Sequence, residues 1–130
     1  MDKLNVQKAN KSDWDKLLIL LEEAGLTDNL APDESHERFY LSYDNEKKDL
    51  ICCFKIDYEN KVGILKSFGI NKKYRGKDLG IYFAEKAIEE SKKLGLEKLY
   101  ASSWEAPGFW KKTKFKEIEK GKIKDKYFIE

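Results

Sequence analysis

Four short stretches of this chain have the hydrophobic pattern of β-strands, and in two of them, residues 4–9 and 50–58, apolar and polar residues alternate as in half-buried strands. Residues 4–9 and 39–43 predict the first two strands. Residues 50–58 are apolar at every second position, which predicts a long strand with one apolar face. Residues 62–70 are apolar at nearly every position, so this strand is expected at the centre of a sheet. The polar residues 59–61 predict a hairpin turn between these two strands.

Two longer stretches repeat their apolar residues at helical spacing. Residues 13–24 predict an amphipathic helix with Ser12 or Asp13 as its N-cap and Gly25 as its stop. Residues 79–94 predict a second helix that ends at Gly95. Its apolar positions are Leu79, Phe83, Ala84, Ala87, Ile88 and Leu94.

The order of these elements predicts a single domain over residues 1–130 with one mixed sheet and helices on its faces. A strand at 98–104 should pair in parallel with the 62–70 strand, because a helix connects them. Residues 26–37 predict a loop with a short helix near 33–37, and residues 105–113 a loop with another short helix. Short strands at 115–119 and 123–129 complete the chain.

Composition narrows the function classes. The 130 residues include 26 basic and 24 acidic ones, and this near-balance argues against a general nucleic-acid binder. No apolar run approaches the roughly 20 residues of a membrane span, and the first residues lack the apolar region of a secretory signal. Adjacent Cys52 and Cys53 should point to opposite faces of a strand, where they neither pair nor build a metal site. We therefore expect a reduced, cytoplasmic protein without a metal.

The stretch from Phe68 to Gly80 carries the clearest chemical signal, because an apolar strand runs through a basic turn into a helix. Glycines allow a backbone to approach a ligand closely, and the first amides of a helix have no intrahelical partner. Those amides and the helix dipole favour an anion. Four cationic side chains strengthen the prediction of a phosphate-binding turn: Lys72, Lys73, Arg75 and Lys77. The alternative is a solvated loop in a lysine-rich protein.

Two residues inside the 62–70 strand break its apolar pattern. Gly69 indicates a bulge or a close approach by a ligand. Lys66 shares a face with Val62, Ile64, Phe68 and Ile70, so its ammonium group either extends past these neighbours to solvent or meets an anionic group in a cleft.

With this order of elements, the chain resembles the GCN5-related N-acetyltransferase (GNAT) family over nearly its full length. The strongest part is residues 66–80, which resemble the family's segment of strand, arginine–glycine turn and helix. Residues 109–115 resemble its closing aromatic-rich helix. Residues 20–26 and the Lys66-Ser67 strand look most like the branch that acetylates the α-amino group of amino acids or amino-acid-like toxins.

The resemblance implies acetyl-CoA as co-substrate and a small-molecule amine as acceptor. The charge balance and the lack of a long apolar run lead us to expect no nucleic-acid or membrane partner, and a homodimer is compatible with the resemblance. The pyrophosphate would bind to backbone amides of the turn, and the pantetheine amides would pair with the edge of the strand before it. The implied cofactor-binding residues are Phe68, Gly69, Ile70, Arg75, Gly76, Lys77, Asp78, Leu79, Gly80 and Trp110.

Two departures from the family pattern leave alternatives open. Asp78 stands where the family usually has glycine. Its carboxylate either caps the following helix and turns away from the diphosphate, or occupies the anion site and weakens binding. Trp110 stands where many members carry a tyrosine that protonates the thiolate, a role that an indole cannot fill.

Direct attack of an amine on the acetyl carbonyl needs a base and a proton donor. The resemblance implies Glu105 as the base and Tyr127 as the proton donor. The residues expected to bind the amine acceptor are Lys66, Ser67 and Ser103. Other candidates are Asp57, Glu59, Glu22 and His36 for the base, and Tyr100 or a water for the donor. The competing hypothesis is a non-catalytic module of the same fold that binds acyl-CoA or a protein partner.

Overall fold

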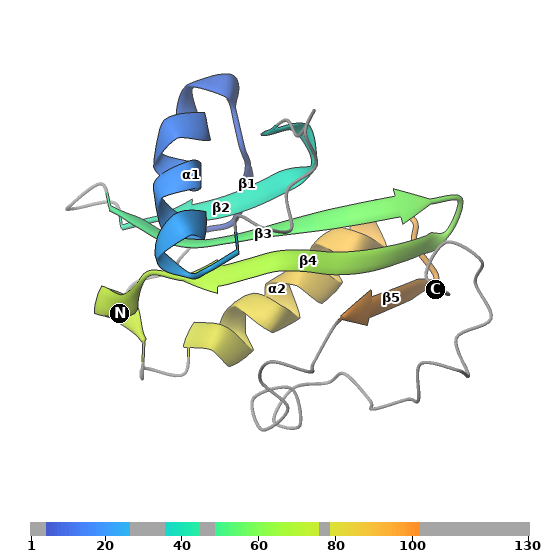
Figure 1. Cartoon of the computed structure of the whole chain (residues 1–130). Helices are drawn as coiled ribbons and strands as arrows, with labels where there is room; N and C mark the ends of the chain where they lie inside the picture. Colours follow the sequence, from blue (N-terminus) through green and yellow to red (C-terminus); the bar gives the residue numbers. More distant parts are fainter. Residues whose placement is uncertain (1–4, 27–35, 45–48, 76–78, 102–130) are drawn as a thin grey trace.

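The computed structural model describes residues 5–26, 36–44, 49–75 and 79–101, and these form one five-stranded sheet with helices on both faces (Figure 1). The strands lie in the order β1-β2-β3-β4-β5. All neighbours are antiparallel except β4 and β5, which are parallel. The strands are β1 (Gln7–Lys8), β2 (Phe39–Tyr43), β3 (Leu50–Glu59), β4 (Val62–Ile70) and β5 (Lys98–Ala101), and the α-helices are α1 (Trp14–Glu23) and α2 (Leu79–Lys93). The predicted fold class is confirmed.

The β3–β4 hairpin sets the register at the centre of the sheet. Its two-residue turn is Asn60 and Lys61, with Asn60 in the left-handed region at a φ of 57°. Glu59 pairs with Val62, and the antiparallel register then brings Asp57 opposite Ile64 and Lys55 opposite Lys66. The helix α2 connects β4 to β5, which is why these two strands run in parallel.

Helix α1 covers one face of the sheet, which we call the α1 face. Its inward side and the sheet bury a cluster of Ala9, Leu17, Leu20, Leu21, Phe39, Leu41, Leu50 and Cys53. Trp14 packs edge-to-face on Phe39 with ring centroids 5.8 Å apart. At the other end of the helix, a Cβ on Gly69 would lie 3.4 Å from both Ala24 Cβ and Leu26 Cδ1. The glycine therefore lets the C-terminal end of α1 approach β4.

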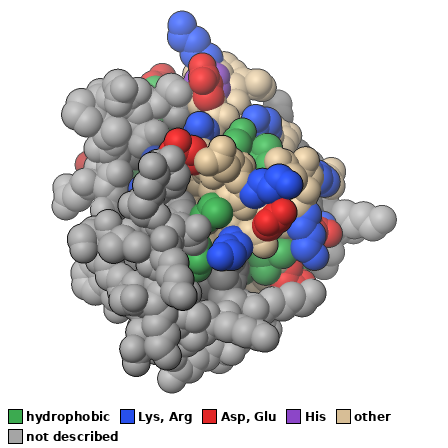
Figure 2. Space-filling view, turned by 90° about the vertical axis from the view of Figure 1, so that its right-hand side faces the viewer, with side chains coloured by type: hydrophobic (Ala, Val, Ile, Leu, Met, Phe, Trp, Pro, Cys, Tyr) green, Lys and Arg blue, Asp and Glu red, His purple; other side chains and the backbone are tan. Residues whose placement is uncertain are grey.

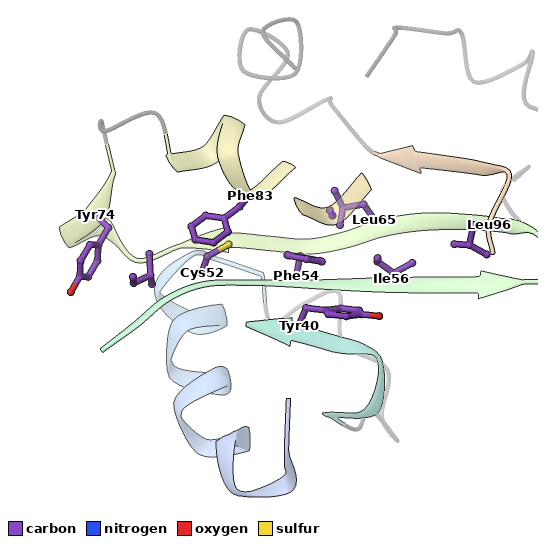
Figure 3. Close-up of a cluster of buried hydrophobic side chains, with 10 residues drawn as sticks. Tyr40, Cys52, Phe54, Ile56, Leu65, Tyr74, Phe83 and Leu96 are labelled. Atoms are coloured by element: carbon purple, nitrogen blue, oxygen red, sulfur yellow. The ribbon is translucent and has the colours of Figure 1, made fainter. Parts of the chain in front are cut away.

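Helix α2 covers the opposite face, which we call the α2 face (Figure 3). Rings from three neighbouring strands stack there, with centroids 5.2 Å apart for Tyr40 and Phe54 and 6.2 Å apart for Phe54 and Phe68. The buried members of this cluster are Tyr40, Ile51, Cys52, Phe54, Ile56, Leu65, Tyr74, Phe83, Ala87 and Leu96. Cys52 and Cys53 thus point to opposite faces as predicted, and both are free and buried.

Both helices end as the sequence predicts. Gly25 and Gly95 have φ angles of 71° and 80°, and each follows its helix with a matched pair of closing hydrogen bonds. The Gly25 and Leu26 amides donate to Glu22 O and Leu21 O, and the Gly95 and Leu96 amides donate to Lys92 O and Ser91 O. This is the Schellman arrangement, which glycine favours because the left-handed conformation has no Cβ penalty for it.

Several predicted details differ in the structure. The first strand is only Gln7–Lys8, and a 3₁₀ turn at Lys11–Asp13 precedes α1. Asp13 does not cap α1 with its side chain. Its carboxylate instead accepts hydrogen bonds from the Asn10 amide at 2.7 Å and from the Tyr43 hydroxyl at 2.6 Å. The short helix near 33–37 is a 3₁₀ turn at His36–Arg38, and residues 33–35 lie outside the described residues.

The predicted apolar face of β3 is confirmed, since Cys52, Phe54 and Ile56 are buried in the cluster under α2. The other face of β3 is also buried over the first seven residues, which the sequence pattern did not predict. The reason is that α1 covers the second face. Of the helices in the described segments, none has the length and hydropathy needed to cross a membrane.

Candidate functional site

Strand β4 extends beyond its ladder with β5. The parallel pairing runs from Val62 opposite Lys98 to Leu65 opposite Ala101. Residues 66–70 of β4 lie past that point, while their other edge still pairs with β3 as far as Ile70. Residues 102–104, the rest of the strand predicted at 98–104, lie outside the described residues.

A β-bulge lies in this second half of β4. Lys55 pairs with Lys66 and Cys53 pairs with Gly69, so three steps along β4 match two along β3. Ser67 is the residue of β4 in the left-handed conformation at this bulge, with a φ angle of 54°. Left-handed backbone at a non-glycine residue is strained, and such residues concentrate at functional sites.

The bulge changes which side chains share a face. Lys66 lies on the α1 face with Lys55, whereas Phe68 stacks on Phe54 on the α2 face. The prediction that Lys66 shares a face with Phe68 and Ile70 was therefore wrong. The predicted irregularity exists, but it falls at Ser67, two residues before Gly69.

Two observations describe the surroundings of Ser67. The Cys53 thiol donates a hydrogen bond to Ser67 O at 3.5 Å, and burial raises the pKa of this thiol to about 12, so it stays a protonated donor. The Ser67 hydroxyl is buried, and no hydrogen-bond partner for it is found in the described part of the chain. Leaving a buried hydroxyl unpaired costs free energy, and among the described residues Ser42 has the same property as Ser67.

The turn that follows β4 is held to the sheet. Asn71 Nδ2 donates to Leu50 O at 3.0 Å, and Asn71 Oδ1 accepts from the Lys73 amide at 3.1 Å. The Tyr74 hydroxyl donates to Asp44 Oδ2 at 2.7 Å, and this hydrogen bond together with burial raises the pKa of Tyr74. These hydrogen bonds hold the turn next to Asp44 at the end of β2 and to Leu50 at the start of β3.

Arg75 is the last described residue before the predicted pyrophosphate turn. Its Nε donates to Ile70 O at 3.1 Å, so the guanidinium group lies against the C-terminal end of β4. The next described residues, Leu79 and Gly80, begin α2, whose first turn contains no acidic residue. Gly76, Lys77 and Asp78 lie outside the described residues, so the two alternatives for Asp78 stay open.

Three charged side chains form a cluster on the α1 face, which we call the Lys55–Asp57–Lys66 cluster. Asp57 Oδ2 lies 3.4 Å from Lys55 Nζ and 3.4 Å from Lys66 Nζ. The side chain of Lys55 is 5% exposed, that of Asp57 31% and that of Lys66 46%. Lys55 Nζ also lies 5.7 Å from the centroid of the Phe39 ring.

Sequence reasoning missed Lys55. The predicted three-residue turn at 59–61 would bring residue 54 opposite residue 66, whereas the observed two-residue turn at Asn60 and Lys61 brings Lys55 opposite Lys66. Periodicity alone assigned Lys55 to a polar, solvated face.

The structure brings together only part of the predicted site. Lys66, Ser67, Phe68, Gly69, Ile70 and Arg75 follow one another along the second half of β4 and the turn after it. Of the alternative bases, Asp57 is ion-paired, Glu22 and Glu59 are exposed, and His36 lies in the 3₁₀ turn before β2. Ser103, Glu105, Trp110 and Tyr127 lie outside the described residues. The described residues contain no group of three or more side chains suited to hold a metal ion.

Comparison with solved structures identifies the fold. N-acetylglutamate synthase from Neisseria gonorrhoeae, in a complex with coenzyme A and N-acetyl-glutamate, superposes with a TM-score of 0.77 at 12% identity over 98% of this chain. A GNAT-family acetyltransferase from Staphylococcus aureus superposes with a TM-score of 0.71 at 18% identity, covering 93% of this chain and 89% of its own. This chain has the GNAT fold.

A third similar structure is an acetyltransferase that is named for a different substrate. Glucosamine-6-phosphate N-acetyltransferase from Arabidopsis thaliana superposes with a TM-score of 0.63 at 20% identity, covering 95% of this chain and all of its own. The chain spans about a third (32%) of the length of the Neisseria synthase. No family model and no curated protein matches the sequence.

Proposed function

We propose that this GNAT-fold chain is a single-domain, acetyl-CoA-dependent N-acetyltransferase that transfers an acetyl group to the primary amine of a small molecule. The observation that carries the proposal is the second half of β4. It continues past the described ladder with β5, contains the strained Ser67, and leads through the basic turn into α2.

The described residues fit acetyl-CoA in two respects. The edge of β4 at Phe68, Gly69 and Ile70 supplies backbone groups to which the pantetheine amides can pair as an added strand. The first amides of the 15-residue helix α2, with no acidic side chain in the first turn, suit the pyrophosphate. In this proposal Arg75, Gly76, Lys77, Asp78, Leu79 and Gly80 surround the pyrophosphate, and Trp110 contacts the cofactor.

The acetyl group supplied by the co-substrate would lie beside the bulge. The neutral amine attacks the thioester carbonyl, so that a C–N bond forms as the C–S bond breaks. In the proposed assignment Glu105 removes the proton of the ammonium group and Tyr127 protonates the departing thiolate. Lys66, Ser67 and Ser103 face the acceptor.

An amino acid or an amino-acid-like toxin is the acceptor class that we propose. The sequence resemblance of residues 20–26 and of the Lys66-Ser67 strand supports this class. The Neisseria synthase, whose structure holds N-acetyl-glutamate, supports it as well.

Calorimetry with acetyl-CoA followed by a thiol-release assay over a panel of amines tests the proposal. We expect binding, and thiol release with at least one amine. No detectable binding of acetyl-CoA would contradict the proposal. Binding without thiol release would instead favour the non-catalytic module.

Substitution of Arg75 tests the site itself. Arg75→Gln should weaken acetyl-CoA binding about tenfold, because a charge-assisted hydrogen bond contributes about 1.5 kcal/mol and 1.4 kcal/mol corresponds to a factor of ten. Lys92→Gln is the matched control, since Lys92 is an exposed cation in the last turn of α2. Equal affinities of the two variants, both folded by circular dichroism, would show that Arg75 does not contact the cofactor.

A further inference from the structure

Strands β3, β4 and β5 lie side by side in Figure 1, and the Lys55–Asp57–Lys66 cluster belongs to β3 and β4 at the point where the described ladder of β4 with β5 ends. Lys66 follows Leu65, the last β4 residue paired with β5, and precedes Ser67, the residue of the bulge. The cluster is therefore adjacent in the sequence and in the sheet to the bulge beside which the acetyl group would lie.

Burial makes the inner pair of this cluster unusual for a strand of a soluble domain. A lysine with a 5% exposed side chain loses most of its hydration, and the cost is tolerated only when the ammonium group is paired. Asp57 supplies a carboxylate at 3.4 Å, and the Phe39 ring lies beneath the same ammonium group. Lys55 is thus the buried base of the cluster, and Asp57, with a 31% exposed side chain, connects it to Lys66.

Lys66 is the member that reaches solvent. Its side chain is 46% exposed, and its contact with Asp57 uses the oxygen atom that also contacts Lys55. An ammonium group has three N–H donors, so Lys66 can keep its contact with Asp57 and still bind an incoming acceptor oxygen. The contact with Asp57 restricts the positions that this ammonium group can take.

We propose that Lys66, positioned by Asp57 and Lys55, binds a carboxylate of the acceptor, so that the substrate is an amine that also carries a carboxylate group. This inference rests on the proposed acetyltransferase function and specifies its substrate. The ammonium group of Lys66, with its 46% exposed side chain, offers one accessible positive charge to such a carboxylate. The Asp57 carboxylate disfavours a doubly charged phosphate, because it repels the second negative charge more strongly in a partly buried site.

Matched pairs of reaction products test the inference without requiring turnover. Calorimetry would compare N-acetyl-L-alanine, N-acetyl-L-leucine, N-acetyl-L-glutamine and N-acetyl-L-glutamate with their α-carboxamides, with coenzyme A present and absent. We expect at least one acid to bind about tenfold more tightly than its amide, the size of one charge-assisted contact. Lys66→Met should remove that preference, and Lys66→Arg should retain most of it.

Lys61→Met is the control, because Lys61 lies in the turn of the same hairpin with a 69% exposed side chain and contacts Glu97 at 3.4 Å. It should leave the acid preference unchanged. The inference is overturned if no acid binds more tightly than its amide, if folded Lys66→Met keeps the preference, or if inorganic phosphate binds more tightly than every acid. Failure of acetyl-CoA binding or of thiol release would instead contradict the proposed function, because the product comparison requires neither.

Discussion

At the scale of single residues, Ser67 determines the geometry of the candidate site. Its left-handed backbone allows β4 to carry one more residue than β3 between two paired positions. As a result, Lys66 and Phe68 lie on opposite faces of the sheet, whereas in a regular strand they would lie on the same face. A serine at this position accepts a conformational cost of about 1 kcal/mol that glycine would avoid.

Ser67→Gly should therefore increase the free energy of unfolding by up to about 1 kcal/mol, measured by urea denaturation. Ser42→Gly is a matched control, because Ser42 is also a buried strand serine, and its φ angle is not in the positive range. It should lower the free energy of unfolding by about 0.5–1 kcal/mol, as glycine does in a regular strand. If both variants lose stability equally, Ser67 is not strained.

At the scale of elements, side-chain hydrogen bonds connect segments that are distant in the sequence. The Tyr43 hydroxyl of β2 donates to Asp13 at the start of α1, and the Tyr74 hydroxyl of the turn after β4 donates to Asp44. Burial, followed by the hydrogen bond to Asp13, raises the pKa of Tyr43 to about 12 from a usual value of 10. The unfolded chain therefore releases this proton at a lower pH than the folded chain.

This difference predicts a loss of stability with rising pH between about 10 and 12. In that window the folded protein binds more protons than the unfolded one, so the free energy of unfolding falls as the pH rises. Tyr43→Phe should make that fall less steep and leave the slope below pH 9 unchanged. Urea titrations of the wild type and the variant at a series of pH values measure both slopes. Identical slopes between pH 10 and 12 would contradict the raised pKa.

The limits of sequence reasoning also lie at this scale. Gly25 and Gly95 ended both predicted helices correctly, because local conformation decides where a helix stops. The hairpin turn was predicted one residue too long, at 59–61, and this error shifts the register between β3 and β4 by one residue. Ser67 carried no comparable signal, since serine is not typical of a left-handed bulge. The burial of Lys55 is a tertiary effect, with Asp57 and the Phe39 ring of β2 beside its ammonium group, and local periodicity cannot report it.

At the scale of the whole molecule, charges of both signs are mixed on the described surface. Figure 2 shows this on the end of the molecule that lies at the right of Figure 1, where basic side chains stand next to acidic ones. The mixture agrees with the balance of 26 basic and 24 acidic residues. A local site such as the turn after β4 is therefore the expected place for anion binding, and the sheet with a helix on each face holds it in position.

A crystal structure with coenzyme A bound tests the central claim most directly, namely that β4 beyond Leu65 and the turn before α2 form an acetyl-CoA site. We predict that the pantetheine amides pair with backbone groups of residues 66–70 and that the pyrophosphate contacts the amides of residues 75–80. Coenzyme A bound elsewhere, or a strand of the chain itself paired along that edge of β4 and excluding the cofactor, would contradict the claim.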